Sequence, residues 1–434
     1  MMYDAVIGLE VHAELNTKTK MYCACENRFG GDTNSRICPI CAGMPGAMPA
    51  LNREAVVMAI SAGLMMGCEI NRVTRMCRKH YFYPDLPKGY QISQYKDPLC
   101  VNGSFDYFSD NTVKTAYIRQ IHIEEDAGKL THGDVTAVDL NRCGVPLIEI
   151  VTQPCFNSAI DAYSFLTSVR TMLLYLGISD CAMQEGSLRC DVNVSLRPHG
   201  VPELSPRVEM KNVSTFTGAR RAIEFEIARQ RVVLESGGVI FSETRRWDDE
   251  ARCSYLMRDK ESANDYRFMP EPDIPPIAID EKTINSCSER LPEGEISRCL
   301  RYIKELQIGE YEAHEIAKQP DLSRFLDECS MEAAKSCASY LLGDVSHIIN
   351  SSGMALKDSK LTPSELCKIV CALKNNEING AAAKIILSEI FINGGSFKDI
   401  ACRLKLIQMT DDTELSRIVK SVLESNQKAI SDYK

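Results

Sequence analysis

An export signal and long apolar runs are both missing from this sequence. The first residues, MMYDAVIGLE, carry neither the basic region nor the apolar segment of a secretory signal peptide. The longest nearly apolar run, Ala55 to Cys68, is shorter than the ~20 residues of a membrane-spanning helix, and we interpret it as a buried helix. We therefore expect a cytoplasmic protein without membrane contacts.

An excess of basic charge is also missing. The chain carries 50 Lys and Arg residues against 59 Asp and Glu residues, a formal net charge of −9. This balance argues against a general nucleic-acid coat but leaves room for a local basic patch, because phosphate contacts are local. The length of 434 residues allows two or three domains of ordinary globular composition.

Two common chemical signatures are missing as well. Gly128-Lys129 lacks both the glycine five positions earlier and the following Ser or Thr of a phosphate-binding loop. No Ser/His/Asp or Cys/His arrangement of a nucleophilic enzyme stands out. A phosphate loop therefore does not compete with the charged strands, described below, for nucleotide binding.

Cysteine, in contrast, is abundant, with 19 residues. Because a reducing cytosol keeps thiols free, we interpret most of them, such as Cys367 and Cys371, as small buried hydrophobes. Four alone form a constellation, with the spacing C-x-C-x12-C-x2-C: Cys23, Cys25, Cys38 and Cys41. This spacing predicts a structural zinc site, since four thiolates leave no open coordination position. The alternative is four unrelated cysteines in a cysteine-rich chain.

The segment from Ala5 to Leu15 alternates strictly between apolar and polar positions. Its polar positions are Glu10, His12 and Glu14, so one strand buries one face and presents two carboxylates and an imidazole on the other. These groups bind hard cations or transfer protons. The segment therefore predicts one wall of an active site.

Isolated Asp or Glu residues recur in four later strand-like segments: IHIEEDAGKL, CGVPLIEIVTQP, SLRCDVNVSLR and RVEMKNVSTF. A single polar strand face usually faces solvent. Several such strands in one sheet bring carboxylates together, and adjacent carboxylates repel unless a cation joins them. The sequence therefore predicts a cradle for a divalent cation, most simply Mg²⁺, with Lys and Arg side chains meeting nucleotide phosphates.

Residues 79–94, KHYFYPDLPKGYQISQ, combine aromatic rings with cations and two prolines. A stiff loop of this composition suits stacking on a nucleic-acid base and contact with phosphate. Rings that pack back onto the sheet are the alternative, and composition does not decide between the two.

Near Pro292 the mixture of strands and helices gives way to helical segments. In the second part Thr362 is a predicted N-cap with Pro363 at the first helical position. Gly380 and the Gly394-Gly395 pair separate further helices, and a last helix starts at about Asp412.

Ten motifs, in order, now identify a family. They are GLEVHAEL, the cysteine pairs, CAGMPGAMPALN, YFYPDLPKGYQISQ, IEEDAGKL, NRCGVPLIEIV, RCDVNVS, VEMKN, ETRRWD and DYRFMPEPD. Together they cover nearly all of residues 5–275 and resemble the B subunits of the bacterial aspartyl/glutamyl-tRNA(Asn/Gln) amidotransferases.

The resemblance implies an α+β fold, in which an antiparallel β-sheet cradle with flanking helices precedes an all-α helical domain and a helical tail. Residues 1–292 would form the cradle, with the zinc knuckle at 23–41 and the site for ATP, metal and the tRNA acceptor end. Residues 293–405 would form the helical domain. Residues 406–434 would begin a truncated tail that contacts the tRNA body.

The resemblance also implies a carbon–nitrogen ligase. It would use ATP to phosphorylate the side-chain carboxylate of Glu-tRNA(Gln) or Asp-tRNA(Asn), and amidate it with ammonia that a partner amidase (glutaminase) releases from glutamine. With this larger partner and a small third subunit the chain would form a heterotrimer. A non-catalytic, zinc-stapled tRNA-binding scaffold is the alternative function, and an ATP-dependent ligase of a free small acid is a third.

Roles carried over by motif complete the expectations. The Mg²⁺ ligands would be Glu10, His12, Glu125 and Glu149, and the catalytic residues Asp191, Glu209 and Lys211. ATP would be held by Lys79, Lys88, Asp191 and Lys211, while Tyr81, Tyr83 and Tyr90 would line the pocket for the tRNA 3′ end. The structural zinc would lie on Cys23, Cys25, Cys38 and Cys41.

Overall fold

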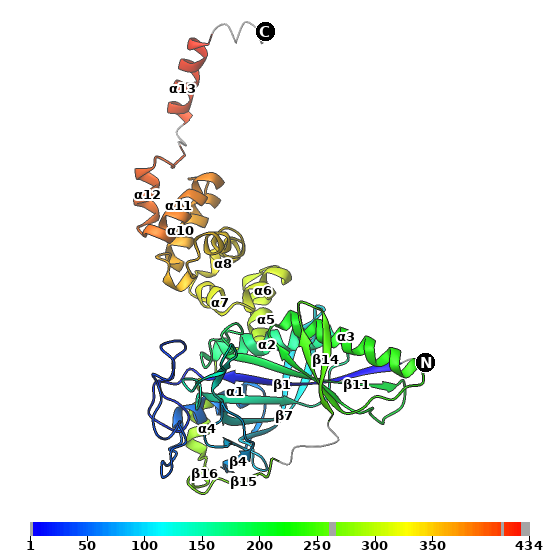
Figure 1. Ribbon diagram of the computed structural model, residues 1–434. Helices are drawn as coiled ribbons and strands as arrows, with labels where there is room; N and C mark the ends of the chain where they lie inside the picture. The colour runs from blue at the N-terminus through cyan, green and yellow to red at the C-terminus, as the bar shows by residue number, and fades with distance from the viewer. Residues whose placement is uncertain (1–2, 260–265, 409–411, 427–434) are drawn as a thin grey trace. The chain divides into compact units, whose positions relative to one another are not determined.

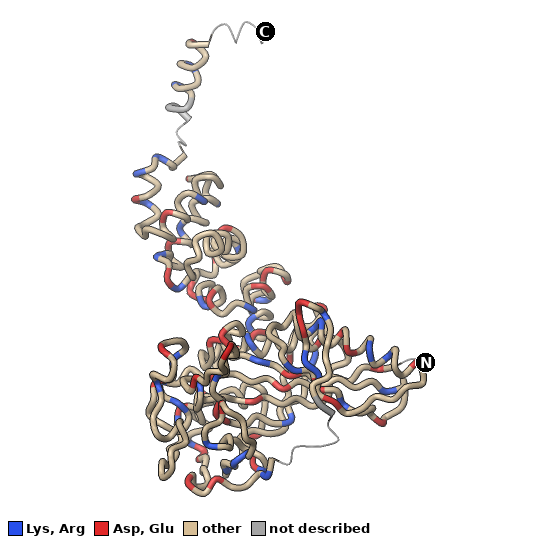
Figure 2. The backbone as a smooth tube through the Cα atoms, in the orientation of Figure 1, with Lys and Arg blue, Asp and Glu red and all other residues tan. Residues whose placement is uncertain are grey.

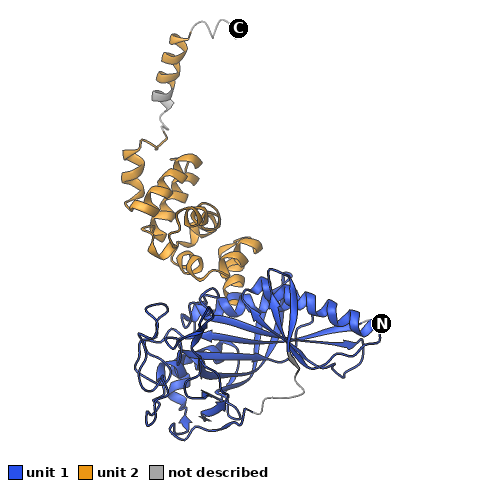
Figure 3. Cartoon of the chain, viewed as in Figure 1, with its two compact units in different colours: residues 1–296 blue, residues 297–434 orange. Residues whose placement is uncertain are grey.

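The computed structural model describes residues 3–259, 266–408 and 412–426. The chain forms two compact units, residues 1–296 and residues 297–434 (Figure 3). Residues 409–411 and 427–434 of the expected tail lie outside the described residues. Acidic and basic positions are interspersed along both units (Figure 2). Among the described residues, no helix is both long and apolar enough to cross a membrane.

A nine-stranded open sheet forms the centre of the first unit (Figure 1). In spatial order its strands are β14 (Cys253–Asp259), β13 (Glu243–Asp248), β12 (Val208–Val213), β11 (Leu188–Pro198), β1 (Tyr3–Glu14), β10 (Pro146–Thr152), β7 (Thr112–Glu125), β6 (Cys100–Ser109) and β2 (Glu69–Ile70). Neighbouring strands are antiparallel except β12 and β13, which run parallel. Strand β1 therefore lies in the middle, with β11 and β10 as its neighbours.

Three small sheets accompany the large one. They are built from β15 (Met269–Pro270), β4 (Cys77–His80) and β5 (Tyr90–Ser93), from β16 (Ile277–Ala278) and β3 (Val73–Thr74), and from β8 (Lys129–Thr131) and β9 (Ala137–Asp139). The β4–β5 hairpin contacts β7 and carries the aromatic loop 81–89. This contact positions the loop beside the centre of the large sheet.

Helices cover one face of the sheet, and the hydrophobic core of the first unit lies between them and the sheet. They are α1 (Arg53–Met65), α2 (Ala159–Leu176) and α3 (Phe216–Glu235), and α4 (Glu281–Ser288) packs on α1. The period of two in β1 places Ile7, Leu9 and Val11, at most 1% exposed, in this core. Helix α1 confirms the buried helix predicted from the apolar run. Charged residues of opposite parity lie on the other face of the sheet.

The second unit is helical throughout its described residues. Its helices are α5 (Glu295–Leu306), which begins just before the unit boundary, α6 (Glu310–Ala317), α7 (Pro320–Asp327), α8 (Met331–Tyr340), the π-helix η1 (Leu341–Val345), α9 (Ser346–Ser352), the short 3₁₀ helix η2 (Leu356–Asp358), α10 (Pro363–Lys374), α11 (Gly380–Asn393), α12 (Phe397–Arg403) and α13 (Asp412–Ser425). Thr362 caps α10 by accepting a hydrogen bond from the Glu365 N–H, as predicted. A sheet-based unit followed by helices confirms the α+β fold class.

Candidate functional site

The register of the central strands brings charged residues together on the face opposite the helices. His12 on β1 lies opposite Glu149 on β10, and Glu149 lies opposite His122 on β7. On the other side of β1, Glu10 lies opposite Asp191 of β11. Because directly opposed side chains are ~5 Å apart at Cβ, this register places imidazoles and carboxylates within reach of one another.

His12, Glu124 and Glu149 form the first group, called here the histidine–carboxylate group. One ligand atom from each lies within 4.8 Å of the others. The His12 Nε2 is 3.3 Å from a Glu149 oxygen and 4.0 Å from a Glu124 oxygen. His122 completes the surroundings, with its Nε2 3.0 Å from the same Glu149 oxygen. One imidazole with two carboxylates is a donor set that divalent cations accept.

Charge balance in this group depends on His12 and on the neighbouring His122. Burial by itself lowers the pKa of His12, but the carboxylates of Glu149, Glu124 and Asp191 together outweigh it and raise that pKa to about 9. In the same way Glu149 and Glu124 raise the pKa of His122 to about 10 against the effect of burial. The imidazoliums in turn hold the pKa of Glu149 well below its ordinary value. Two protonated imidazoles therefore balance the two ionised carboxylates at this buried place when no metal ion is bound.

Glu10, Asp191 and Glu209 form the second group, called here the three-carboxylate group, with ligand atoms also within 4.8 Å. Burial, followed by repulsion from neighbouring carboxylates, raises the pKa of Glu10. The Lys211 ammonium relieves part of this repulsion, because it lies 2.6 Å from Asp191 and 2.9 Å from Glu209. Such a set of oxygen ligands suits a hard cation such as Mg²⁺.

Asn193 on β11 lies beside the three-carboxylate group. Its Nδ2 donates a hydrogen bond of 3.0 Å to Glu10, whereas its buried Oδ1 has no hydrogen-bond partner within the described parts of the chain. Glu10 and His12 are two residues apart on β1, so the two groups are separated by ~7 Å along the strand. Unsatisfied buried oxygen and accumulated negative charge both fit a bound cation at this face.

Glu125 is not brought together with the other expected ligands. Side chains alternate along β7, and His122 has the parity of Glu124, so Glu125 points away from the histidine–carboxylate group. There it accepts a hydrogen bond of 2.9 Å from the Ile92 N–H and forms an ion pair with Lys88. Glu124 therefore takes the place that the sequence-based ligand set gives to Glu125, and Lys88 is occupied by this ion pair.

The β4–β5 hairpin packs against the same end of β7. Ser93 donates a hydrogen bond of 3.1 Å to Glu124, which ties the hairpin to the histidine–carboxylate group. The positive charge of Lys79 is among the influences that lower the pKa of Glu124, although burial opposes them. The Lys79 ammonium also lies 5.1 Å from the centre of the Tyr266 ring. A cation and an aromatic ring thus border the histidine–carboxylate group.

The rings of the aromatic loop fall into two sets. Phe82 and Tyr83 are 91% and 55% exposed, whereas Tyr81 and Tyr90 are half-buried. The guanidinium of Arg78 lies 4.4 Å from the centre of the Tyr90 ring, and Tyr81 meets Tyr266 edge to face. Both interpretations of the loop are therefore partly met, because two rings pack back onto the protein and two project into solvent.

A hollow of about 410 Å³ opens beside Tyr90 and Lys88. Its other walls come from residues 40–49, Arg78, Ile92 and Asp273. Arg78 is fixed there by two hydrogen bonds to Glu271, of 2.7 and 2.8 Å. The hollow therefore offers an aromatic ring and fixed cations beside the β4–β5 hairpin.

The four predicted zinc ligands converge on one point. The Cys41 sulfur lies 3.9 Å from that of Cys38 and 4.0 Å from that of Cys25, and the four sulfurs all lie within 4.8 Å of one another. Tetrahedral Zn–S bonds of ~2.3 Å separate sulfur atoms by ~3.8 Å. A hydrogen bond from Cys23 lowers the pKa of the Cys41 thiol to about 4, and the Lys20 ammonium, 3.7 Å from its sulfur, adds to this effect. This four-cysteine cluster fits a metal ion.

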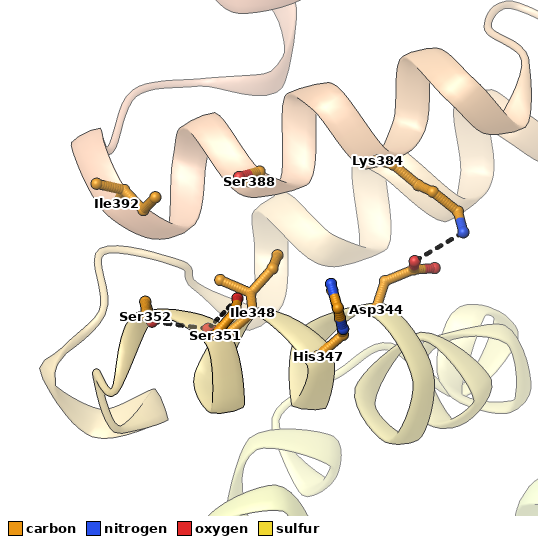
Figure 4. A pocket seen from close by; sticks show the side chains of 8 residues that line it. All are labelled: Asp344, His347, Ile348, Ser351, Ser352, Lys384, Ser388 and Ile392. Atoms are coloured by element: carbon orange, nitrogen blue, oxygen red, sulfur yellow. Dashed lines mark hydrogen bonds and ion pairs between the residues drawn. The ribbon is translucent and has the colours of Figure 1, made fainter.

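A larger hollow, of about 560 Å³, lies in the second unit between α9 and α11 (Figure 4). Of the eight residues that line it, Asp344 is the one carboxylate, and Lys384 neutralises it at 3.0 Å. The remaining lining consists of His347, three serines and two isoleucines. The hollow therefore lacks the convergent charged groups of the sheet, which remains the candidate site.

The fold and the site define a class of α+β protein with buried groups of carboxylates and imidazoles on one face of a mostly antiparallel sheet. Comparison with known proteins makes the class specific. Residues 5–285 match the family described as the GatB/GatE catalytic domain, and residues 324–434 match the GatB domain. The chain belongs to the B-subunit family of the tRNA-dependent amidotransferases, which confirms the resemblance drawn from its motifs.

Relatives extend over the whole chain. The B subunit of the aspartyl/glutamyl-tRNA(Asn/Gln) amidotransferase of Caldicellulosiruptor bescii is 45% identical over 442 residues, and that of Thermoanaerobacter pseudethanolicus is 44% identical over 438 residues. The corresponding protein of Lachnoclostridium phytofermentans is 42% identical over 438 residues. Each alignment covers 100% of this chain and 92% of the relative.

Proposed function

We propose that this chain uses ATP to phosphorylate the side-chain carboxylate of Glu attached to tRNA(Gln), or of Asp attached to tRNA(Asn), and that it then amidates the activated group. Family membership supports the amidotransferase class. One observation carries the phosphorylation step: two cation-competent groups, the histidine–carboxylate group and the three-carboxylate group, meet on one sheet face.

The chemistry needs alignment and positive charge rather than a general base. A substrate carboxylate is ionised at neutral pH, so its oxygen attacks the γ-phosphorus directly while the bond to the bridging oxygen breaks and ADP leaves. Ammonia then forms a bond to the acyl carbon, phosphate leaves, and the proton lost by nitrogen passes to solvent. The result is Gln or Asn on the tRNA.

The residues of the sheet face are proposed to divide this work. Bound Mg²⁺ would neutralise the phosphate oxygens in the transferred group. The histidine–carboxylate and three-carboxylate groups would hold the cation, while Lys211, between Asp191 and Glu209, would present an ammonium to the phosphates. Lys79 would add a second ammonium near Glu124. Fixed charges of this kind stabilise a transition state without reorganising during the reaction.

The tRNA 3′ end is proposed to enter along the aromatic hairpin. Exposed rings offer stacking surfaces for unpaired bases, each worth ~1–3 kcal/mol. Tyr83 is the exposed member of the expected set, whereas Tyr81 and Tyr90 would line the inner wall. Lys88 would support this wall through its ion pair with Glu125 rather than contact ATP.

The remaining expectations stay part of the proposal. A partner amidase (glutaminase) would release ammonia from glutamine, a small third protein would join the two larger ones in a heterotrimer, and the complex would act in the cytoplasm. The relatives are named as one subunit of an enzyme, which supports an assembly of several chains. The four-cysteine cluster would hold a structural Zn²⁺, and residues 406–434 would contact the tRNA body.

The discriminating experiment replaces Glu124 by Gln in the assembled complex. Because a cation at such a site supplies several kcal/mol of charge stabilisation, we expect phosphorylation of the aminoacyl group to fall at least ~100-fold, with tRNA affinity changed less than ~2-fold. Glu69→Gln, at an exposed position of β2, serves as the matched control. Full phosphorylation by the Glu124 variant would favour the alternative function, a zinc-stapled tRNA-binding scaffold.

A further inference from the structure

A second cysteine cluster lies in the helical unit, far along the chain from the four-cysteine cluster. Cys329 follows α7, Cys337 belongs to α8 and Cys367 to α10. Their sulfur atoms all lie within 4.8 Å of one another, and those of Cys337 and Cys367 are 3.8 Å apart. The sequence interpretation, which took Cys367 and Cys371 as buried packing residues, misses this three-cysteine cluster, and Cys371 is in fact exposed.

The sulfur separation is compatible with a shared metal ion, although a direct contact between two thiols has the same length. Sulfur atoms bound at ~2.3 Å to one ion are ~3.8 Å apart in a tetrahedral site. The 3.8 Å between Cys337 and Cys367 therefore equals the expected edge, and it matches the 3.9 Å between Cys38 and Cys41 in the first unit. A disulfide would instead bring two sulfurs to ~2 Å and leave the third thiol unused.

The surroundings leave room for a fourth ligand. Cys337 is buried, whereas Cys329 and Cys367 are half-buried, so the cluster has a wall and an open side. On that side the Ser330 hydroxyl lies 3.8 Å from the Cys367 sulfur. Two of the cysteines stand on helices, which hold them without a bound ion, so metal binding needs little rearrangement.

We propose that the three-cysteine cluster is a second metal site that binds Zn²⁺ through three thiolates, with water or the Ser330 hydroxyl as the fourth ligand. Thiolates select soft and borderline ions such as zinc over Mg²⁺. The ion joins the segment between α7 and α8, the body of α8 and α10, so it cross-links the helical unit. This site is independent of the carboxylate groups on the sheet and of the reaction proposed for them.

The test counts metal in the full chain. Protein stripped with a chelator under reducing conditions and reloaded with Zn²⁺ in excess Mg²⁺, which occupies the carboxylate groups of the sheet, is expected to bind about two equivalents of Zn²⁺, one in each cysteine cluster. Cys367→Ser is expected to bind about one equivalent, because it disrupts the three-cysteine cluster. Cys41→Ser disrupts the four-cysteine cluster and is also expected to bind about one equivalent, which would show that the two sites are separate. Cys371→Ser, one turn further along α10 and exposed, is the matched control and keeps about two.

A second measurement uses the unmodified chain, so its result does not depend on whether a variant folds. Zn²⁺ is expected to slow alkylation of Cys367 at least ~10-fold relative to the stripped chain, because a metal-bound thiolate is not free to react, while Cys371 is alkylated equally in both states. Equal stoichiometry for Cys367→Ser and Cys371→Ser, with no protection of Cys367, overturns the proposal and leaves the cluster as packing. A Cys337–Cys367 disulfide found by mass spectrometry in the freshly purified chain overturns it in favour of a redox pair.

Discussion

Lys211 is the residue whose replacement we expect to lower the rate of phosphorylation most clearly. Its ammonium lies between Asp191 and Glu209, and these partners raise its pKa despite burial. We expect Lys211→Ala to lower single-turnover phosphorylation of the aminoacyl group by ~100–1,000-fold, as loss of one preorganised donor to a developing charge does elsewhere. Lys129→Ala, at an exposed position of β8, is the control. Equal loss in both variants would exclude a specific role for Lys211.

Lys88 and Glu125 form a buried ion pair whose partners depend on each other. Their side chains are only 9% and 2% exposed. Lys88→Met is expected to lower the free energy of unfolding of the chain by ~3 kcal/mol, because it leaves a buried carboxylate unpaired. The double variant Lys88→Met/Glu125→Gln should regain at least half of this loss. Urea denaturation measures both, and a single variant with the wild-type midpoint would contradict the interpretation.

Strand alternation explains which site residues the sequence predicts and which it does not. The period of two over residues 5–15 places Glu10 and His12 correctly on one face, because β1 is regular. Glu124 is missed in favour of Glu125, although Ile121 and Ile123, both fully buried, already mark the inner parity of β7. Which group each ligand joins depends on the pairing of strands distant in sequence, and no local pattern reports that register.

At the scale of elements, Asp161 fastens α2 to the β6–β7 hairpin. It accepts hydrogen bonds from Ser109 at 2.7 Å and from Lys114 at 2.6 Å. Burial favours the neutral acid, but these two partners, together with a hydrogen bond from Ser158, outweigh it and hold the pKa of Asp161 below its ordinary value of 3.8. The ionised side chain therefore stabilises the fold above that value.

We expect Asp161→Asn to cost ~1 kcal/mol of unfolding free energy at pH 7, a modest value because Lys114 is partly exposed. A lowered pKa in the folded state means that the contribution persists above pH 3.8 and is lost as the pH falls through the folded-state pKa. Urea midpoints of the two proteins should therefore differ equally at pH 7 and pH 5 and approach each other as the pH falls below 3.8. A gap that stays constant down to pH 3 would contradict the role of the carboxylate.

The four-cysteine cluster is expected to stabilise the loop that it closes. Cys38→Ser should remove about one zinc per chain and lower the melting temperature of the sheet unit, since zinc contributes ~10–16 kcal/mol of apparent binding free energy in small zinc-binding folds. Cys402→Ser, at an exposed position of α12, should change neither quantity. If the stripped wild-type chain melts like the loaded one, the cluster is packing rather than a metal site.

Elements differ in how far local sequence determines them. Thr362 and Pro363 specify the start of α10 by themselves, because the cap is made within four residues. The three-cysteine cluster has no comparable signature, since Cys329, Cys337 and Cys367 meet only through the packing of α8 with α10. The four-cysteine cluster is predictable from sequence spacing because its two close pairs of cysteines belong to one loop.

At the scale of the whole molecule, the two units differ in secondary structure and in the groups that could bind a cation. The described carboxylate groups that could hold a cation lie on the sheet of residues 1–296, whereas the described secondary structure of residues 297–434 is helical. The proposal assigns chemistry to the first unit and additional tRNA contact to the end of the second. Contacts far from the reacting atoms bind substrate and transition state alike, so they change affinity rather than the rate of the bound complex.

This division is tested by Arg417→Ala/Lys420→Ala on α13, where both residues are exposed. In the assembled enzyme we expect tRNA to bind ~10-fold more weakly at low salt. The slope of log affinity against log salt should become less steep by ~1–2, because tRNA binding releases fewer counterions when two phosphate contacts are missing. The amidation rate at saturating tRNA should be unchanged. Lys129→Ala/Lys282→Ala, two exposed positions of the sheet unit, is the control. A lower saturated rate with unchanged affinity would instead place α13 in the catalytic step and end the assignment of chemistry to the sheet alone.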